Sequence, residues 1–483
     1  MFTFFWQRRI ALLLAALLLI LSFGCGGAAM SQPTPTPEEI VFRPETTAPA
    51  NKPTPVSTTG LKYIFLFIGD GMGYAQVQAA DEALSAAGRD LLCFPVFPVQ
   101  GSAHTGNIDG EITDSAAAAT AIATGIKTKN GYLGLDKDGN RLTDVSETLR
   151  DTGRKIGILT TVSLDHATPA GFYAHVSSRR TYATISDDLF ASGFDFFAGG
   201  GFHETPDATN YAAENGYAMI SSFEEAPSAA DGRLILSSSL IFGDYGVIPA
   251  IDGGARAGWL KKATDLAIAR LTNPAGFFMM VEGGRIDYFC HYNDAGSFVA
   301  ELLDFNDAVR SALDFYAAHP AETLIVVTAD HETGDVSFTD GERKALLRQT
   351  ISSDLCDDTL VAECVSAQTP FDEALPLFIS AFGLNNLTAE ETDYLAKAYA
   401  HTLKGDLSTN KANEEYGVYD PVTSACDRLV AARAGLVFGS GDHTGKDVPV
   451  YAIGIGSEFF ADTYENTYLH DAILQAAAAY PVS

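Results

Sequence analysis

Five short, uninterrupted apolar runs constrain the fold of this 483-residue chain more than any other feature. They span residues 61–68, 156–162, 277–281, 324–327 and 448–455. An unbroken apolar run has no polar face, so such a strand must be covered on both sides, which is typical of a mainly parallel sheet packed between helices. Three segments with helical patterning separate the runs, at residues 115–123, 258–271 and 298–318. The sequence therefore predicts an α/β fold.

Polar side chains with metal-binding chemistry follow four of these runs. The clusters are Gly69-Asp70-Gly71-Met72-Gly73, Asp165-His166-Ala167-Thr168, Glu282 and Asp330-His331. In open α/β sheets, ligands bind outside the carboxyl ends of the strands. We therefore expect these carboxylates and imidazoles to converge in one crevice. The alternative is that each cluster only solvates its own loop, in which case the clusters need not lie together.

Further candidate ligands lie on a predicted helical turn and in a late loop. Asp287 and His291 are four residues apart, so on a helix both face the same way and can clamp one ion. His443 lies in a glycine-flanked loop just before the last apolar run. Taken singly, the pair also fits an exposed charge pair, and a lone loop histidine usually has no chemical role.

A candidate nucleophile stands at the start of a helix of small residues, over residues 113–121. Thr113 or Asp114 can cap this helix, which leaves Ser115 where unsatisfied N–H groups and the helix dipole favour an oxyanion or a phosphate. A plain capping serine on an alanine-rich helix is the alternative interpretation. Arg179 is either a surface charge or a bidentate clamp for an oxyanion.

The order of these motifs along the chain resembles that of the alkaline phosphatase family. The resemblance extends over residues 62–458 and also includes Glu282-Gly283-Gly284-Arg285-Ile286-Asp287 and Asp330-His331-Glu332-Thr333-Gly334. Each motif alone is weak, but the full ordered set is specific. The resemblance implies a three-layer α/β/α sandwich with a central mainly parallel sheet. It also implies hydrolysis of phosphate monoesters to an alcohol and inorganic phosphate through a phosphoserine intermediate.

The resemblance implies a site with two Zn²⁺ and one Mg²⁺. One zinc would be held by Asp287, His291 and His443. The second zinc would be held by Asp70, Asp330 and His331. The third cation would be held by Asp70, Thr168 and Glu282, with His166 standing where some members have Asp, which leaves the identity of this cation open. Ser115 would be the nucleophile, Arg179 would grip two phosphate oxygens, and Asp114 would orient Arg179.

Two features distinguish this chain within the resemblance. Tyr288 stands where other members carry Lys, His or Trp, and its phenol supplies no fixed positive charge at neutral pH. We therefore predict weaker phosphate affinity than in a relative with Lys at this position. Residues 341–433 are rich in helix formers and predict a helical insertion, which in this family lies above the active site and at subunit contacts. The family commonly forms homodimers.

Two other functions remain open from the sequence. One is a different hydrolase of the same superfamily, a phosphodiesterase or a phosphonate hydrolase; diesterases generally lack the third-metal pair Thr168 and Glu282, which is present here. The other is a non-catalytic lipoprotein that binds phosphate or metal. Degenerate enzymes usually lose the nucleophile or a ligand first, whereas Ser115 and all of the expected ligands are present.

The N-terminus predicts export. Arg8 and Arg9 precede an apolar stretch over residues 10–23, which is shorter than the roughly 20 residues that span a bilayer. The following Gly24-Cys25 resembles the end of a bacterial lipobox, which predicts a signal peptide over 1–24 and a lipid anchor at Cys25, in the periplasm or at the cell surface. A plain cleaved signal or a short membrane anchor is the alternative. Residues 25–60 predict a Pro/Thr-rich tether, followed by a phosphatase domain over 61–483.

Charge excludes one class of partner. The chain has 61 acidic and 31 basic residues, a net charge of −30, and no basic run that could bind nucleic acid. Phosphate chemistry is compatible with this charge, because three divalent cations would bring +6 into a crevice with four implied carboxylate ligands. The predicted partners are therefore small phosphate monoesters.

Overall fold

The computed structural model describes residues 60–482, apart from 206, 230, 244–245, 255–256 and 406–418. The predicted signal peptide, the anchor at Cys25 and the predicted tether up to residue 59 lie outside the described residues. Within the described part, no helix combines the length and the apolar character needed to cross a bilayer.

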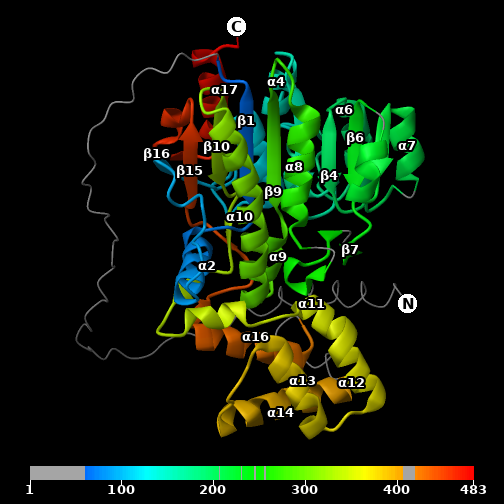
Figure 1. Ribbon diagram of the computed structural model, residues 1–483, viewed down its shortest axis with the longest axis vertical. Coiled ribbons are helices and arrows are strands. Elements are labelled where there is room, and N and C mark those ends of the chain that lie inside the picture. Colours follow the sequence, from blue (N-terminus) through cyan, green and yellow to red (C-terminus); the bar gives the residue numbers. More distant parts are fainter. Residues whose placement is uncertain are drawn as a thin grey trace, which may run out of the picture. The chain divides into compact units, whose positions relative to one another are not determined.

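A ten-stranded sheet organises the described chain (Figure 1), with strand order β16-β2-β15-β10-β1-β9-β3-β4-β6-β5. In that order the strands are Asp462–Glu465, Val99–His104, Val448–Gly454, Thr323–Thr328, Tyr63–Gly69, Phe277–Gly283, Lys155–Thr160, Phe196–Gly199, Arg233–Ser237 and Tyr217–Ile220. Neighbours are parallel except at β15, which runs antiparallel to both β10 and β2. The predicted mainly parallel sheet is confirmed, and the last apolar run forms its antiparallel member.

The three central strands are in register, so they end together. Every residue of β1, β9 and β10 is buried, as their unbroken apolar sequences predict. Ile68 near the end of β1 pairs with Glu282 on one side and with Thr328 on the other. Because parallel strands in register end at one edge of the sheet, the residues that follow them emerge side by side.

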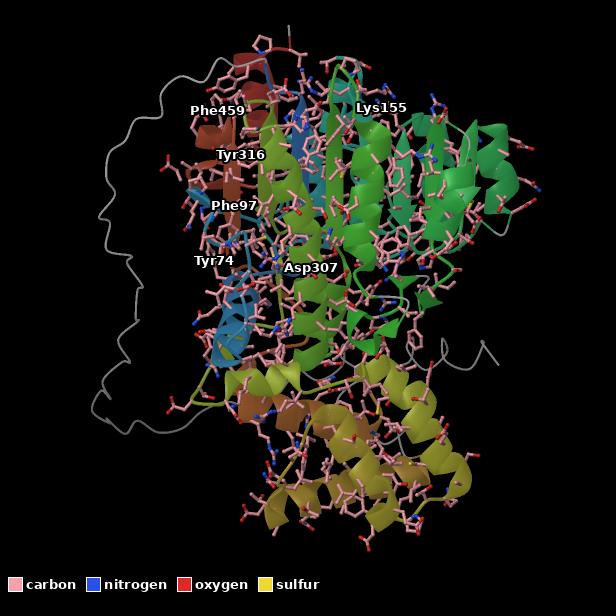
Figure 2. The ribbon with its side chains drawn as sticks, in the orientation of Figure 1. Tyr74, Phe97, Lys155, Asp307, Tyr316 and Phe459 are labelled. Atoms are coloured by element: carbon pink, nitrogen blue, oxygen red, sulfur yellow. The ribbon has the colours of Figure 1, made fainter. Side chains whose placement is uncertain are left out.

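Helices cover both faces of the sheet, which confirms the three-layer α/β/α sandwich. Figure 1 shows α8 (Trp259–Leu271) and α10 (Ala295–Ala318) lying across one face. The other face carries α3 (Ser115–Thr124), α4 (Val145–Arg150), α5 (Ala167–Ala170) and α17 (Tyr468–Ala479). Figure 2 draws the side chains between the layers, among them the half-buried Tyr316 and Phe459, which pack against the core. The remaining helices of these layers are α2 (Tyr74–Ala86), α6 (Tyr182–Ser192) and α7 (Ala208–Glu214).

The segment predicted as a helical insertion is helical and gathers beyond the end of the sheet from which α9 (Arg285–His291) emerges (Figure 1). Its helices are α11 (Ser353–Cys356), α12 (Ala362–Ala367), α13 (Phe371–Phe382), α14 (Ala389–Lys404) and α16 (Pro421–Ala434). A ladder between β12 (Val336–Phe338) and β13 (Leu436–Phe438) closes its base. Two further ladders pair β11 (Glu332–Thr333) with β14 (His443–Thr444), and β7 (Ile241–Phe242) with β8 (Gly246–Val247).

Candidate active site

The four predicted strand-end clusters converge in one crevice. Asp70, Glu282, Asp330 and His331 follow or end the central strands, and each has a side chain with no exposed surface. Thr168 Oγ1 donates to Asp70 Oδ2 at 3.2 Å, and His331 Nε2 lies 3.5 Å from Asp70 Oδ1. The structure therefore brings together side chains that are up to about 260 residues apart in sequence, as the strand-end rule predicts.

Asp287, His291 and His443 form a second group at the rim of this crevice. Asp287 Oδ2 lies 3.2 Å from His291 Nε2, one turn along α9, and Asp287 Oδ1 lies 3.7 Å from His443 Nε2. His443 does not lie in a simple loop, as the sequence suggested, but in β14, where it pairs with Thr333 of β11. This ladder is what brings a residue late in the chain against α9.

The two histidines of this group turn their Nε2 atoms towards each other. His291 Nδ1 donates to the Gly441 carbonyl at 2.6 Å, and His443 Nδ1 donates to the Thr113 carbonyl at 3.0 Å, because a carbonyl can only accept. In the neutral tautomers both Nε2 atoms then carry lone pairs, and these atoms are only 3.0 Å apart. Two facing lone pairs beside a carboxylate require a proton or a cation between them. Although burial opposes it, the Asp287 carboxylate raises the pKa of His291 to about 9.

Around His331, buried acceptors lack hydrogen-bond donors among the described residues. Asp70 Oδ1 and Asp330 Oδ2 are both unpartnered, and Asp330 Oδ2 lies 3.3 Å from His331 Nε2. Burial, then the neighbouring Asp330, raises the pKa of Asp70 well above its usual range, and burial, then Asp287, raises the pKa of Asp330 to about 7. Burial also lowers the pKa of His331. These groups fit a divalent cation, which would offset the repulsion between the carboxylates.

Ligand atoms of Asp70, Asp287 and His331 lie within 4.8 Å of one another, so Asp287 also reaches this position. It thereby stands between the two predicted zinc positions.

The third predicted cation position fits its residues in the same way. Ligand atoms of Asp70, His166 and Glu282 lie within 4.8 Å of one another. Glu282 Oε1 and His166 Nδ1 are buried without a hydrogen-bond partner among the described residues and lie 3.9 Å apart. Burial raises the pKa of Glu282 to about 8. The other oxygen of Glu282 accepts from Thr160 at the end of β3, a contact that was not predicted, because the strand expected over 156–162 placed Thr160 in its interior.

Ser115 is the first residue of α3 and points into the crevice. Asp114 is the N-cap of the helix and accepts from the Ala117 N–H at 3.0 Å, so of the two predicted caps Asp114 is the one used. Ser115 is 2% exposed, and its Oγ lies 3.2 Å from His331 Nε2. The hydroxyl therefore adjoins the position that fits the second zinc.

Arg179 is held at the mouth of the crevice by two contacts. Its Nη1 donates to Asp114 Oδ2 at 3.2 Å, and its Nη2 donates to His166 Nε2 at 3.1 Å. Asp114 also accepts from the Gly131 N–H, which fixes the carboxylate. The Asp114 carboxylate thus holds the guanidinium at the cavity that Ser115 also lines.

A cavity of about 310 Å³ opens onto these groups. It is lined by Ser115, His166, Arg179, Tyr182, His203, Asp287, Tyr288, His291 and His443. Tyr182 and His203 were not among the residues predicted from the sequence. His203 could have been identified as a candidate from its position soon after β4, at the same edge of the sheet as the other clusters.

Two side chains near the site have structural contacts. Glu332, within the Asp330–Gly334 motif, accepts from Gln76 Nε2 at 2.9 Å and from Val336 N–H at 3.1 Å, so it tethers α2 and β12. Arg285 lies in the motif that opens α9, donates to the Phe242 carbonyl at 2.8 Å and lies 3.9 Å from Asp354 of α11. The helical insertion therefore contacts the helix that carries Asp287 and His291.

Comparison with known proteins agrees with this geometry. The family model described as alkaline phosphatase matches residues 61–194 and 241–479. The chain belongs to the alkaline phosphatase family. Alkaline phosphatase 4 of Bacillus subtilis is 30% identical over 429 residues, covering 84% of this chain and 87% of the relative. The streptomycin-6-phosphate phosphatase of Streptomyces griseus is 32% identical over 355 residues, covering 60% of this chain and 78% of the relative.

Solved structures of this family have the same fold. The cold-active alkaline phosphatase of a psychrophilic Shewanella superposes with a TM-score of 0.75 at 27% identity, covering 86% of this chain and 99% of that chain. The alkaline phosphatase of the Antarctic bacterium TAB5 superposes with a TM-score of 0.62 at 26% identity, covering 87% of this chain and 99% of that chain. A variant of the TAB5 enzyme with a histidine replaced by aspartate has Mg bound in the site called M3. The predicted family and fold are confirmed, and the chain is an enzyme with phosphatase activity.

Proposed function

We propose that the protein hydrolyses phosphate monoesters through a phosphoserine on Ser115, at a site that binds two Zn²⁺ and a third cation. One observation carries the proposal. The Ser115 hydroxyl lies 3.2 Å from His331 Nε2, beside buried Asp70 and Asp330 oxygens that lack donors among the described residues. A nucleophile next to unsatisfied buried acceptors fits a metal-assisted displacement.

The ligand assignment follows the three groups described above. Asp287, His291 and His443 would hold one zinc. Asp70, Asp330 and His331 would hold the other. Asp70, Thr168 and Glu282 would hold the third cation, with His166 beside it, and we propose Mg²⁺ because these are hard oxygen ligands. Two divalent cations about 4 Å apart stabilise the attacking and leaving oxygens of an in-line displacement.

The protein's own residues bind and position the substrate. Arg179 offers a planar pair of N–H donors to two equatorial phosphate oxygens, and Asp114 prevents the guanidinium from turning away. The Ser115 oxygen loses its proton to solvent and attacks phosphorus while the bond to the leaving oxygen breaks, and the departing alkoxide takes up a proton from solvent to become the alcohol. Water then attacks the phosphoserine, which releases inorganic phosphate and restores the hydroxyl. The small cavity favours a compact ester.

Hydrolysis of p-nitrophenyl phosphate by the purified protein, supplied with zinc and magnesium, tests the proposal. We expect activity that a chelator removes, and a loss of several orders of magnitude in Ser115→Ala. Ser85→Ala, an exposed serine on α2, is the matched control and should retain full activity. Absence of chelator-sensitive activity would refute the proposal. A preference for bis-p-nitrophenyl phosphate over p-nitrophenyl phosphate would instead favour a phosphodiesterase.

We further propose that the protein is exported, anchored by lipid at Cys25, and homodimeric. These proposals rest on the N-terminal sequence and on the family's usual assembly. Metabolic labelling with palmitate, compared between the native chain and Cys25→Ser, tests the anchor. Sedimentation of the domain over residues 61–483 tests the dimer.

A further inference from the structure

Two aromatic side chains in the cavity have no part in the proposed chemistry. The rings of Tyr182 and His203 stack on each other, with centroids 4.0 Å apart and planes 12° from parallel. Both line the cavity that also contains Ser115 and Arg179. The pair therefore places an aromatic stack in the wall of the substrate cavity.

The backbone places the two rings from different elements. Tyr182 is the first residue of α6 and follows Arg179 by three positions, so it is tied to the phosphate clamp. His203 follows the carboxyl end of β4, which lies beside β3 in the sheet. Contacts of the Gly200 N–H with Val162 O at 2.8 Å and of the Leu164 N–H with Gly201 O at 3.1 Å hold this connection against the loop after β3.

A buried carboxylate fixes the orientation of His203. Asp165 has no exposed surface, and its Oδ2 accepts from the His203 backbone N–H at 2.8 Å. Its Oδ1 lies 2.8 Å from His203 Nδ1, which donates because Asp165 accepts. Held at both its backbone and its ring, the imidazole loses little freedom when a ligand contacts it, and the stacked Tyr182 restricts it further.

We propose that the Tyr182–His203 pair is the specificity-determining surface for the leaving group, and that it favours phosphate monoesters whose alcohol carries a planar aromatic or heteroaromatic ring. The proposal rests on the phosphomonoesterase function proposed above. Ser115 and Arg179 fix the phosphate end of the substrate, which leaves the alcohol to contact the other lining side chains. A planar ring can extend the existing stack in an offset or edge arrangement, whereas an alkyl group cannot.

His203 lies within residues 195–240, which the family model does not match. Membership of the family therefore assigns this residue no role. A substrate ring that contacts the Tyr182–His203 pair should raise kcat/KM by roughly 2- to 12-fold.

Benzyl phosphate and ethyl phosphate provide the test, because both are monoesters of primary alcohols and differ chiefly in the ring. The ratio of their kcat/KM values is measured from phosphate release. Tyr182→Leu and His203→Leu should each lower the benzyl-to-ethyl ratio by roughly 2- to 12-fold. Tyr182→Phe and His203→Phe keep a ring and should retain the ratio within about twofold. Tyr211→Leu, a tyrosine of α7 outside the cavity, should leave both constants unchanged.

An unchanged ratio in both Leu variants, or an equal loss in the Phe variants, would overturn the inference. A wild-type protein that hydrolyses neither ester would instead contradict the proposed function. Thermal unfolding checks each variant. Tyr182→Leu leaves the bonds between His203 and Asp165 intact, so it decides the question if His203→Leu does not fold.

Discussion

Replacing Asp427 by Asn should stabilise the protein progressively as pH rises. Ser353 Oγ lies 2.8 Å from Asp294 Oδ2 and 2.7 Å from Asp427 Oδ2, at the junction of α10, α11 and α16. A hydroxyl has one proton, so it can donate to only one of these carboxyl groups. Asp294 also accepts from the backbone N–H groups of Ser297 and Ser353 and from Gln349 Nε2, so it is the acceptor of the Ser353 hydroxyl as well. Asp427 must therefore be protonated and donate to Ser353.

The sign and size of the effect follow from this proton. Burial, and then the charge of Asp294, raises the pKa of Asp427 well above its usual range. The unfolded chain releases the proton near pH 4, whereas the folded protein keeps it. The stabilisation is thus complete below about pH 4 and is lost as pH rises towards the folded pKa, at about 1.4 kcal/mol per pH unit. Asn binds no proton, so its contribution to stability does not fall as pH rises. Its side-chain amide can still donate an N–H to Ser353.

Urea unfolding of the metal-loaded proteins at pH 5, 6 and 7 measures the effect. The free energy of unfolding of Asp427→Asn, relative to wild type, should increase with pH, by up to about 1.4 kcal/mol per pH unit while the pH stays below the raised folded pKa of Asp427. Titration of Asp330 and Glu282, which are not among the groups that shift Asp427, is common to both proteins and cancels in the difference. Asp294→Asn makes the same replacement at the carboxyl group that accepts several hydrogen bonds, and it should destabilise at every pH, by about 1–3 kcal/mol or more. A difference between Asp427→Asn and wild type that does not vary with pH would refute the assignment of the proton.

Three further predictions concern the active site. Stripping the metals should abolish binding of inorganic phosphate in calorimetry, because the remaining carboxylates repel the anion; retained binding would contradict the proposed site. Tyr288→Lys should strengthen inhibition by inorganic phosphate by adding a positive charge to the cavity, and equal or weaker inhibition would count against this reasoning. Arg179→Lys should lower kcat/KM about tenfold or more, because an ammonium group cannot bind Asp114 and two phosphate oxygens in one plane. The exposed neighbour Arg180→Lys should have no effect, and a similar loss in both variants would argue against a clamp at Arg179.

Much of the site could be predicted because buried strands restrict where polar residues can stand. A strand covered on both faces excludes carboxylates from its interior, so Asp70, Glu282 and Asp330 mark the strand ends directly in the sequence. The spacing of Asp287 and His291 likewise predicted a shared face, since helical periodicity is local. Patterns within a few residues were sufficient for each of these positions.

Other parts of the site depend on contacts between distant segments. His443 approaches His291 only because β14 pairs with β11, and neither two-residue strand has a sequence pattern of its own. The last apolar run has the same sequence pattern as the parallel strands, yet it forms β15, which is antiparallel to β10 and β2. The direction of a strand depends on the connections between strands, which its own sequence does not specify.

The sequence by itself determined the sheet, its family and the candidate ligands at its central strand ends, because apolar periodicity and strand-end chemistry are local properties. Only the tertiary structure decided that β4 lies beside β3 and so brings His203 onto Tyr182, next to the phosphate clamp. It also decided that Asp294 and Asp427 share one hydroxyl. The physical reason is that strand order and helix packing minimise the free energy of the whole chain, and no short segment records which distant segment will be its neighbour.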